Sequence, residues 1–248
     1  MSTTRQDLIG PTLVALNHRE RVDWHHHAEH QLIYPSAGVL QVSTDVGTWV
    51  VPPYRAVWLP AGVPHAHEAH GPTRMLSLVF AVTVNPLRLD RPTVLAVTPL
   101  LREVITALVE DRELTGRPRE HLQQVALDQL RRVEALPLWL PAPADPRLRD
   151  VTDLLRNDPA DPRGLAELGA AVGASERTLS RLFRAQTSMS FPQWRAQNRL
   201  HHSLVLLADG NPVTSVATAC GYGTTSAFIE AFRHAFGTTP GRYHRPVP

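Results

Sequence analysis

The sequence lacks several features that whole classes of protein require. It contains a single cysteine, which excludes a disulfide framework and is typical of a reducing compartment. It has no apolar run of membrane-spanning length, and its first ten residues lack the apolar segment of a secretion signal. Lysine is absent, so all 25 basic residues are arginine. We therefore predict a cytoplasmic protein, with no export and no membrane partner.

The composition that remains is globular, and its charge is unevenly divided. Of the 248 residues, 43% are apolar and 19% charged, and this length suits one large domain or two modest ones. Residues 1–145 carry 13 Arg against 15 acidic residues, whereas residues 163–248 carry 9 against 4. Nine of the 13 histidines lie in the first part. The basic part favours a nucleic-acid partner, although a solvated basic face also explains it.

The spacing of apolar residues changes along the chain. Between residues 31 and 80, short β-type runs alternate with turn residues, which indicates a sandwich or a small barrel. Two segments follow, at 100–114 and 121–136, with apolar residues three and four positions apart, which predicts two helices. The stretch 136–146 holds four prolines in eleven residues and is predicted to link two domains.

After this stretch the sequence repeats a helix-turn-helix pattern. In the first copy, Asp161 is the predicted N-cap of one helix, Gly173 follows its end, and Ser175 caps the next helix. In the second copy, Asn211 and Gly221 have the matching places, and one long predicted helix joins the copies. A single such pattern is common in helical cores, whereas two copies in register are specific.

Residues 146–248 resemble the DNA-binding domain of the AraC/XylS family of transcription regulators. The stretch "GYGTTSAFIEAFRHAFGTTPGRYHR" carries the resemblance most clearly. The resemblance implies a nucleoid-associated activator or repressor that binds double-stranded DNA and a small-molecule effector. It also implies a homodimer, and RNA polymerase as a partner if the protein is an activator. The two amphipathic segments would then pair as an antiparallel helical hairpin and offer the dimer interface.

The second helix of each copy presents a polar face that can contact DNA. Arginine can bind O6 and N7 of guanine with two hydrogen bonds, and serine can bind phosphate. By position, Arg177, Ser180 and Arg181 match the base-contacting residues of the resembled family. Glu230 departs from an arginine-rich face, because its carboxylate repels phosphate but can accept from cytosine N4; a solvated surface position is the alternative. The predicted DNA-binding residues are Arg177, Ser180, Arg181, Arg184, Thr225, Ser226, Glu230 and Arg233.

Four histidines lie in the short stretch "WHHHAEHQ". The spacing His25-x-His27-x3-Gln31, together with a later "PAGVPH" that ends at His65, resembles the two sequence motifs of the cupin family. Two positions depart from these motifs. Gln31 replaces the glutamate of the first motif, and Ala69 replaces the asparagine of the second.

The cupin resemblance implies that His25, His27 and His65 converge inside a barrel, on neighbouring strands. Three imidazoles around a divalent ion suit Zn, Fe, Ni or Cu, and they leave coordination positions open. Glu29 and Gln31 are the candidate fourth ligands. On this hypothesis, replacing any of the three histidines removes the metal.

Three hypotheses for the histidine cluster stay open at the level of the sequence. In the first, neutral histidines and Gln31 line a pocket for a small-molecule effector, and no metal is required. In the second, a transition metal binds, and substitutions of His26 and His67 are silent. In the third, His26, His30, His67 and His70 alternate outward as ordinary surface. Because histidine titrates near neutral pH, pH sensing is also open.

We predict an α+β protein of two domains. Residues 1–137 form a cupin-like sensor and dimerisation domain, with a β-barrel over about 1–84 and a helical hairpin over about 99–136. A linker at 138–146 leads to an all-α domain with two helix-turn-helix units at 147–248. The predicted function is an effector-controlled transcription regulator and not an enzyme. The alternative is a metal-dependent cupin enzyme fused to a DNA-binding domain.

Overall fold

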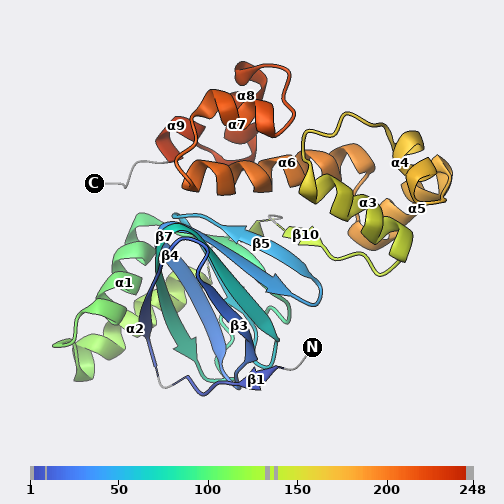
Figure 1. Cartoon of the computed structure of the whole chain (residues 1–248). Helices are drawn as coiled ribbons and strands as arrows, with labels where there is room; N and C mark the ends of the chain where they lie inside the picture. Colours follow the sequence, from blue (N-terminus) through green and yellow to red (C-terminus); the bar gives the residue numbers. More distant parts are fainter. Residues whose placement is uncertain (1–2, 9, 132–134, 137–138, 244–248) are drawn as a thin grey trace. The chain divides into compact units, whose positions relative to one another are not determined.

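The chain folds into an N-terminal unit built on a sheet and a C-terminal unit built of helices (Figure 1). This two-part organisation confirms the predicted one. No helix in the described part of the chain is long and apolar enough to cross a membrane. The first unit comprises Met1–Asp45 and Trp49–Trp139, and the second comprises Val46–Thr48 and Leu140–Pro248. The computed structural model describes residues 3–8, 10–131, 135–136 and 139–243.

Two long antiparallel strands, β4 and β7, form the centre of the sheet. They pair from His30 opposite Phe80 to Thr44 opposite His65, with register shifts around Ala37 that bend both strands. The described strands are β1 (Thr4–Arg5), β2 (Thr12–Leu16), β3 (Arg21–His26), β4 (His30–Thr44), β5 (Gly47–Val51), β6 (Arg55–Leu59), β7 (His65–Phe80), β8 (Thr93–Ala96), β9 (Ala135–Leu136) and β10 (Trp139–Pro141).

The hydrogen-bonded ladder of the sheet is open among the described strands. Its order is β1-β3-β7-β4-β6-β8-β9, while β2 also pairs with β7 and β5 with β4. The end strands β1 and β9 are not paired with each other, so the ladder does not close on itself in the part of the chain that is described. A sheet-based N-terminal unit is therefore established, whereas the closed cupin-like barrel stays a prediction.

Side chains alternate between the two faces of the sheet, as the period of a strand requires. Leu32 of β4 and Leu78 of β7 point to the face that is covered by α1 (Pro99–Glu110) and α2 (Gly116–Leu130). Their neighbours Gln31 and Ser77 point to the opposite face, where they contact each other. Figure 1 shows both helices along one side of the sheet. The apolar sides of the helices are buried against strands of the same chain.

The second helix of this pair differs from its predicted bounds. The prediction was 121–136, but α2 begins at Gly116 and ends at Leu130, and Ala135–Leu136 form strand β9 beside β8. The apolar spacing over 121–136 predicts one helix, whereas this range contains the end of a helix and a short strand. The turn between α1 and α2 is held by Arg119, which donates to the backbone carbonyls of Leu108 and Leu114.

The second unit contains two helix-turn-helix units joined by one long helix. Gly173 and Gly221 adopt positive φ after the first helix of each copy, as predicted, and Ser175 caps α5 by accepting from the amide of Thr178. Its helices are α3 (Pro146–Asn157), α4 (Leu165–Ala171), α5 (Glu176–Thr187), α6 (Phe191–Ala208), α7 (Val213–Ala219), α8 (Thr225–Phe236) and α9 (Pro240–Tyr243).

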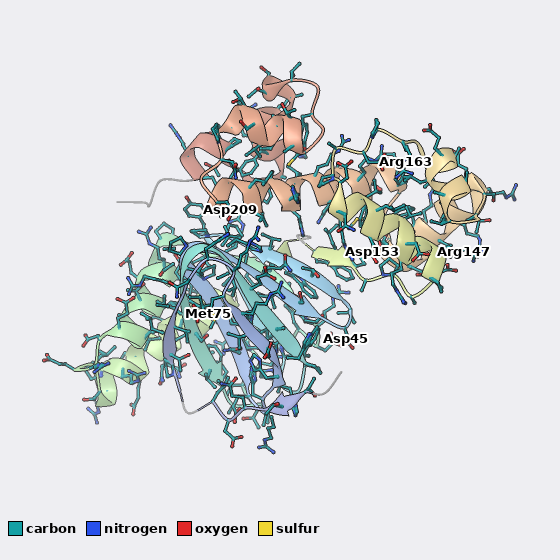
Figure 2. All side chains as sticks on the ribbon, in the orientation of Figure 1. Asp45, Met75, Arg147, Asp153, Arg163 and Asp209 are labelled. Atoms are coloured by element: carbon teal, nitrogen blue, oxygen red, sulfur yellow. The ribbon has the colours of Figure 1, made fainter. Side chains whose placement is uncertain are left out.

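Two predicted caps and part of the predicted linker differ from the structure. Asp161 does not cap α4, whose N-cap is Gly164; its carboxylate pairs instead with Arg163 at 2.6 Å, and Arg163 is labelled in Figure 2. Asn211 lies one residue before the N-cap of α7 and donates to the carbonyl of Leu206. Within the predicted linker, residues 139–141 form strand β10.

The crowding at Gly38 generates a prediction about stability. Gly38 has φ +73°, and an added Cβ would lie 2.5 Å from the carbonyl oxygen of Pro72 and 2.8 Å from Thr73 Cα. Gly62 has a similar φ of +79°, with open space around it. We expect Gly62→Ala to lower the free energy of unfolding by about 1–2 kcal/mol, the cost of a left-handed alanine. Gly38→Ala should cost about 1–3 kcal/mol more, because overpacking is added. Equal losses in urea unfolding would contradict this.

Candidate functional site

Three histidines converge on the face of the sheet opposite to the helices. His25 lies on β3, His27 directly follows this strand, and His65 begins β7, where it is the register partner of His25. Their candidate ligand nitrogens all lie within 4.8 Å of one another, and all three residues are buried. The ring centroids of His25 and His65 are 4.3 Å apart, and those of His27 and His65 are 5.0 Å apart. The structure thus brings together the three histidines that the sequence predicted.

The backbone fixes the protonated nitrogen of each ring. Nδ1 of His25 donates to the carbonyl of Asp23 at 2.8 Å, and Nδ1 of His27 donates to that of Glu29 at 2.7 Å. Nδ1 of His65 likewise donates to the carbonyl of Val63 at 2.8 Å. A carbonyl oxygen can only accept, so each neutral ring keeps its lone pair on Nε2. Imidazoles that bind metals are held in this manner by their second nitrogen.

Gln31 lies between His27 and Ser77. Its amide oxygen lies 3.0 Å from Nε2 of His27, and its amide NH2 group donates to the hydroxyl of Ser77 at 3.2 Å. Nε2 of His65 is buried and has no hydrogen-bond partner among the described residues.

Burial keeps the imidazoles of His25 and His65 neutral. It lowers the pKa of His65 to about 3, although the hydrogen bond to Val63 opposes the shift. Burial also lowers the pKa of His25, and the neighbouring His27 adds to this effect. The cause is that a charged ring loses its hydration in the interior. At neutral pH the lone pairs of these two rings are consequently free of protons.

Three other histidines do not point outward, contrary to the third hypothesis. His30, His67 and His70 are all buried. His30 has a structural role, because its Nδ1 accepts from the amide of Ala61 and its Nε2 donates to the carbonyl of Val82. His67 instead lies beside the cluster, with its ring centroid 5.0 Å from that of His65. The sequence contained this signal, since residues two apart on a strand share a face.

Glu29 does not belong to the group of convergent ligand atoms. That group, among the described residues, consists of His25, His27 and His65. Glu29 contributes its backbone carbonyl to His27 instead of its carboxylate. The side-chain amide of Gln31, in contrast, lies 3.0 Å from Nε2 of His27.

A separate hollow of about 220 Å³ lies beside α2, away from the histidines. Apolar side chains form most of its wall, and Gln123 and Gln124 add two amide groups. It is lined by Pro11, Leu78, Val79, Phe80, Ala81, Val84, Leu108, Gln123, Gln124, Ala126 and Leu127.

The two candidate DNA-contacting helices differ in charge. On α5, Arg177, Arg181 and Arg184 are exposed while Leu179 and Phe183 are buried in the core. Ser180 of the same helix is half-buried. The face of α5 therefore carries three arginines and, at its first turn, one glutamate.

On α8, Ser226, Glu230 and Arg233 are exposed and Thr225 is half-buried. The opposite side of α8 is buried through Phe228, Phe232 and Phe236. Both helices thus present the predicted residues outward, with more positive charge on α5. Their contacts with DNA stay a prediction.

Comparison with known proteins gives matches over both units. A family model described as an AraC-like ligand binding domain matches residues 12–138, and one described as a helix-turn-helix domain matches residues 168–246. The HTH-type transcriptional regulator NimR of Escherichia coli is 35% identical over 225 residues, which cover 88% of this chain and 81% of NimR.

Two further matches are more distant. A putative AraC-like transcription regulator of Streptomyces antibioticus is 32% identical over 188 residues, 68% of this chain and 62% of that protein. A solved structure of fatty-acid-bound ToxT from Vibrio cholerae covers 97% of both chains at 11% identity, with a TM-score of 0.41.

The lowered pKa values generate a prediction about pH. In the unfolded chain histidine has a pKa of about 6.5. Below that pH the unfolded state therefore binds protons that the buried histidines of the folded cluster do not bind. Stability is therefore full above pH 6.5 and falls as the pH drops towards 3, by up to about 1.4 kcal/mol per pH unit for each such histidine. In chelator-treated protein, His65→Gln should flatten the fall between pH 6.5 and 5.

The buried His201 of the second unit also has its pKa lowered, to about 3, but it is present in both proteins and cancels in the comparison. Urea unfolding at several pH values measures the difference. An identical pH dependence for wild type and His65→Gln would show that His65 is not held neutral.

Proposed function

The chain belongs to the AraC family of DNA-binding transcription regulators, and from this membership we propose that a divalent transition-metal ion is its regulatory ligand. The ion would be held by His25, His27 and His65. The observation that carries this proposal is the convergence of three buried imidazoles, each with Nδ1 bound to a backbone carbonyl and Nε2 left as the lone-pair nitrogen.

The donor set fits an ion of the Zn, Ni, Cu or Fe(II) class. Imidazole nitrogen binds these ions well, whereas Mg²⁺ and Ca²⁺ prefer oxygen ligands. An ion here supplies a positive charge that links β3 to β7, the strands that carry His25 and His65. The chain's own residues do the rest. The carbonyls of Asp23, Glu29 and Val63 orient the rings, and burial keeps His25 and His65 deprotonated on Nε2.

Three finer features complete the proposal. The bent strands β4 and β7 and the inward histidines support a cupin-like barrel around the site. Because the relatives are named as transcription regulators, the site serves sensing and not catalysis. The partners are double-stranded DNA, a second copy of the chain and, if the protein activates, RNA polymerase.

A second candidate effector is a small uncharged organic molecule in the hollow beside α2. Among the described residues, the wall of this hollow contains no charged side chain, so a charged ligand would be left unpaired there. Mass spectrometry of the purified protein under native conditions would detect such a molecule, whether or not a metal is bound.

The metal site is tested by metal analysis of the purified chain. We expect alanine at His25, His27 or His65 to lower Zn²⁺ affinity by about 10–100-fold or more, because each removes a ligand. His26→Ala is the control, since His26 is outside the convergent group. A wild-type chain whose melting temperature does not respond to added Zn²⁺ or Ni²⁺ would leave only the organic effector.

The DNA interface is tested through two arginines with different roles. We propose that α5 and α8 enter successive major-groove segments, roughly 34 Å apart, and that one chain contacts an asymmetric site. Arg181→Ala should cost about 1–3 kcal/mol on the specific duplex and relax preference at one base. Arg233→Ala should weaken all duplexes alike and lower the salt slope by about one. If Arg181→Ala weakens specific and scrambled duplexes equally, Arg181 is not a base contact.

The outward side of the helical pair is the proposed dimer interface. The inner sides of α1 and α2 are buried against the sheet, but Leu100 on α1 is 52% exposed. We expect light scattering to show a dimer at tens of micromolar and Leu100→Glu to shift it to monomer, because a charge would be buried at the contact. Leu154→Glu, at a half-exposed leucine in the second unit, is the matched control. A wild type that is strictly monomeric at this concentration contradicts the proposal.

A further inference from the structure

We propose that His67 is the fourth ligand of the metal ion, so that the centre is a closed site of four imidazoles suited to Zn²⁺. This inference rests on the proposed metal site and assigns a residue outside it. His67 lies two residues after His65 on β7 and is 3% exposed. Its Nδ1 is buried and has no hydrogen-bond partner.

The spacing of the rings supports a shared ion. Imidazoles that bind one Zn²⁺ tetrahedrally, with Zn–N of about 2.0–2.1 Å, have ring centroids roughly 5 Å apart. The centroid of His67 lies 5.0 Å from that of His65 and 5.6 Å from that of His25. These separations fit the expected value better than the 6.2 Å between His25 and His27, which both belong to the convergent group.

The surroundings of His67 differ from those of two other buried histidines. His30 has both nitrogens occupied, by the amide of Ala61 and the carbonyl of Val82. His201 on α6 has unpartnered nitrogens, as His67 does, but only His67 of the two has imidazole rings of the cluster as its recorded ring neighbours. Burying a polar nitrogen without a partner is unfavourable, and a ligand removes that cost.

The coordination number separates a sensor from an enzyme. Catalytic zinc sites have three protein ligands and one open position for water or substrate, whereas structural sites are closed by four. A fourth imidazole from His67 would occupy the position that a reaction needs. The ion would then act by its presence or absence, which suits a regulator.

Cobalt spectroscopy on the full-length chain tests this directly. Co²⁺ replaces Zn²⁺, and four-coordinate tetrahedral Co²⁺ absorbs visible light far more strongly than five- or six-coordinate Co²⁺. We expect the intense spectrum from the wild type. His67→Phe keeps the volume but removes the nitrogens, so it should still bind Co²⁺, about 10–100-fold more weakly, with a shifted spectrum, because water replaces one imidazole. His26→Ala should behave as the wild type.

Two further readouts make the outcome decisive. X-ray absorption of the Zn²⁺-loaded wild type counts the imidazoles without any variant, with four expected, and His67→Gln provides a second substitution if His67→Phe does not fold. Three imidazoles, or an unchanged affinity and spectrum in a folded His67 variant, would overturn the assignment and leave the three-histidine site intact. A wild type that binds neither Co²⁺ nor Zn²⁺ would overturn the proposed metal site as well.

Discussion

Three buried imidazoles with fixed protonation are the constraint on which the chemistry of the N-terminal unit depends. The carbonyls of Asp23, Glu29 and Val63 hold the Nδ1 protons, and burial opposes a second proton on His25 and His65. The candidate ligand nitrogens lie within 4.8 Å of one another inside the protein. Their electron pairs repel one another, and Nε2 of His65 has no hydrogen-bond partner among the described residues. A cation is the species that turns this unfavourable arrangement into a favourable one.

Strand β7, which bears one histidine of the cluster, also packs against the helices. β7 holds His65 and Ser77 on one face and Leu78 on the other, where α1 and α2 cover it. A ligand that fixes β3 to β7 therefore acts on a strand that is in direct contact with the helical layer. Gln31 connects the histidine cluster to β7 on the same face of the sheet, because it contacts His27 on one side and Ser77 on the other.

Local signals explain what the sequence predicted well. Glycines at positive φ and the cap at Ser175 act within a few residues, so the helix-turn-helix units could be placed from the sequence alone. The convergence of His25, His27 and His65 was predicted from the motif resemblance. The residues predicted to face DNA follow from the helical period, because the buried side of α5 is set by Leu179 and Phe183.

Non-local pairing explains what the sequence did not predict. Whether a sheet closes depends on which strands pair, and no local pattern specifies this. The β9 segment differs from the predicted helix because its partner β8 lies about forty residues away. One of the three hypotheses placed His67 on the surface, whereas the structure buries it beside His65 on the same strand. Asp161 differs from the predicted cap because the sequence does not show that its carboxylate pairs with Arg163.

We propose that a metal ion in the histidine cluster regulates DNA binding. The most direct measurement is the affinity of the full-length wild type for a duplex that it selects from a random pool, first after chelation and then after Zn²⁺ is restored. Coupling between two sites typically changes affinity by 5–150-fold. We predict a reversible change of about fivefold or more between the two states. An affinity that is the same with and without the ion, in protein shown to bind Zn²⁺, would contradict the claim.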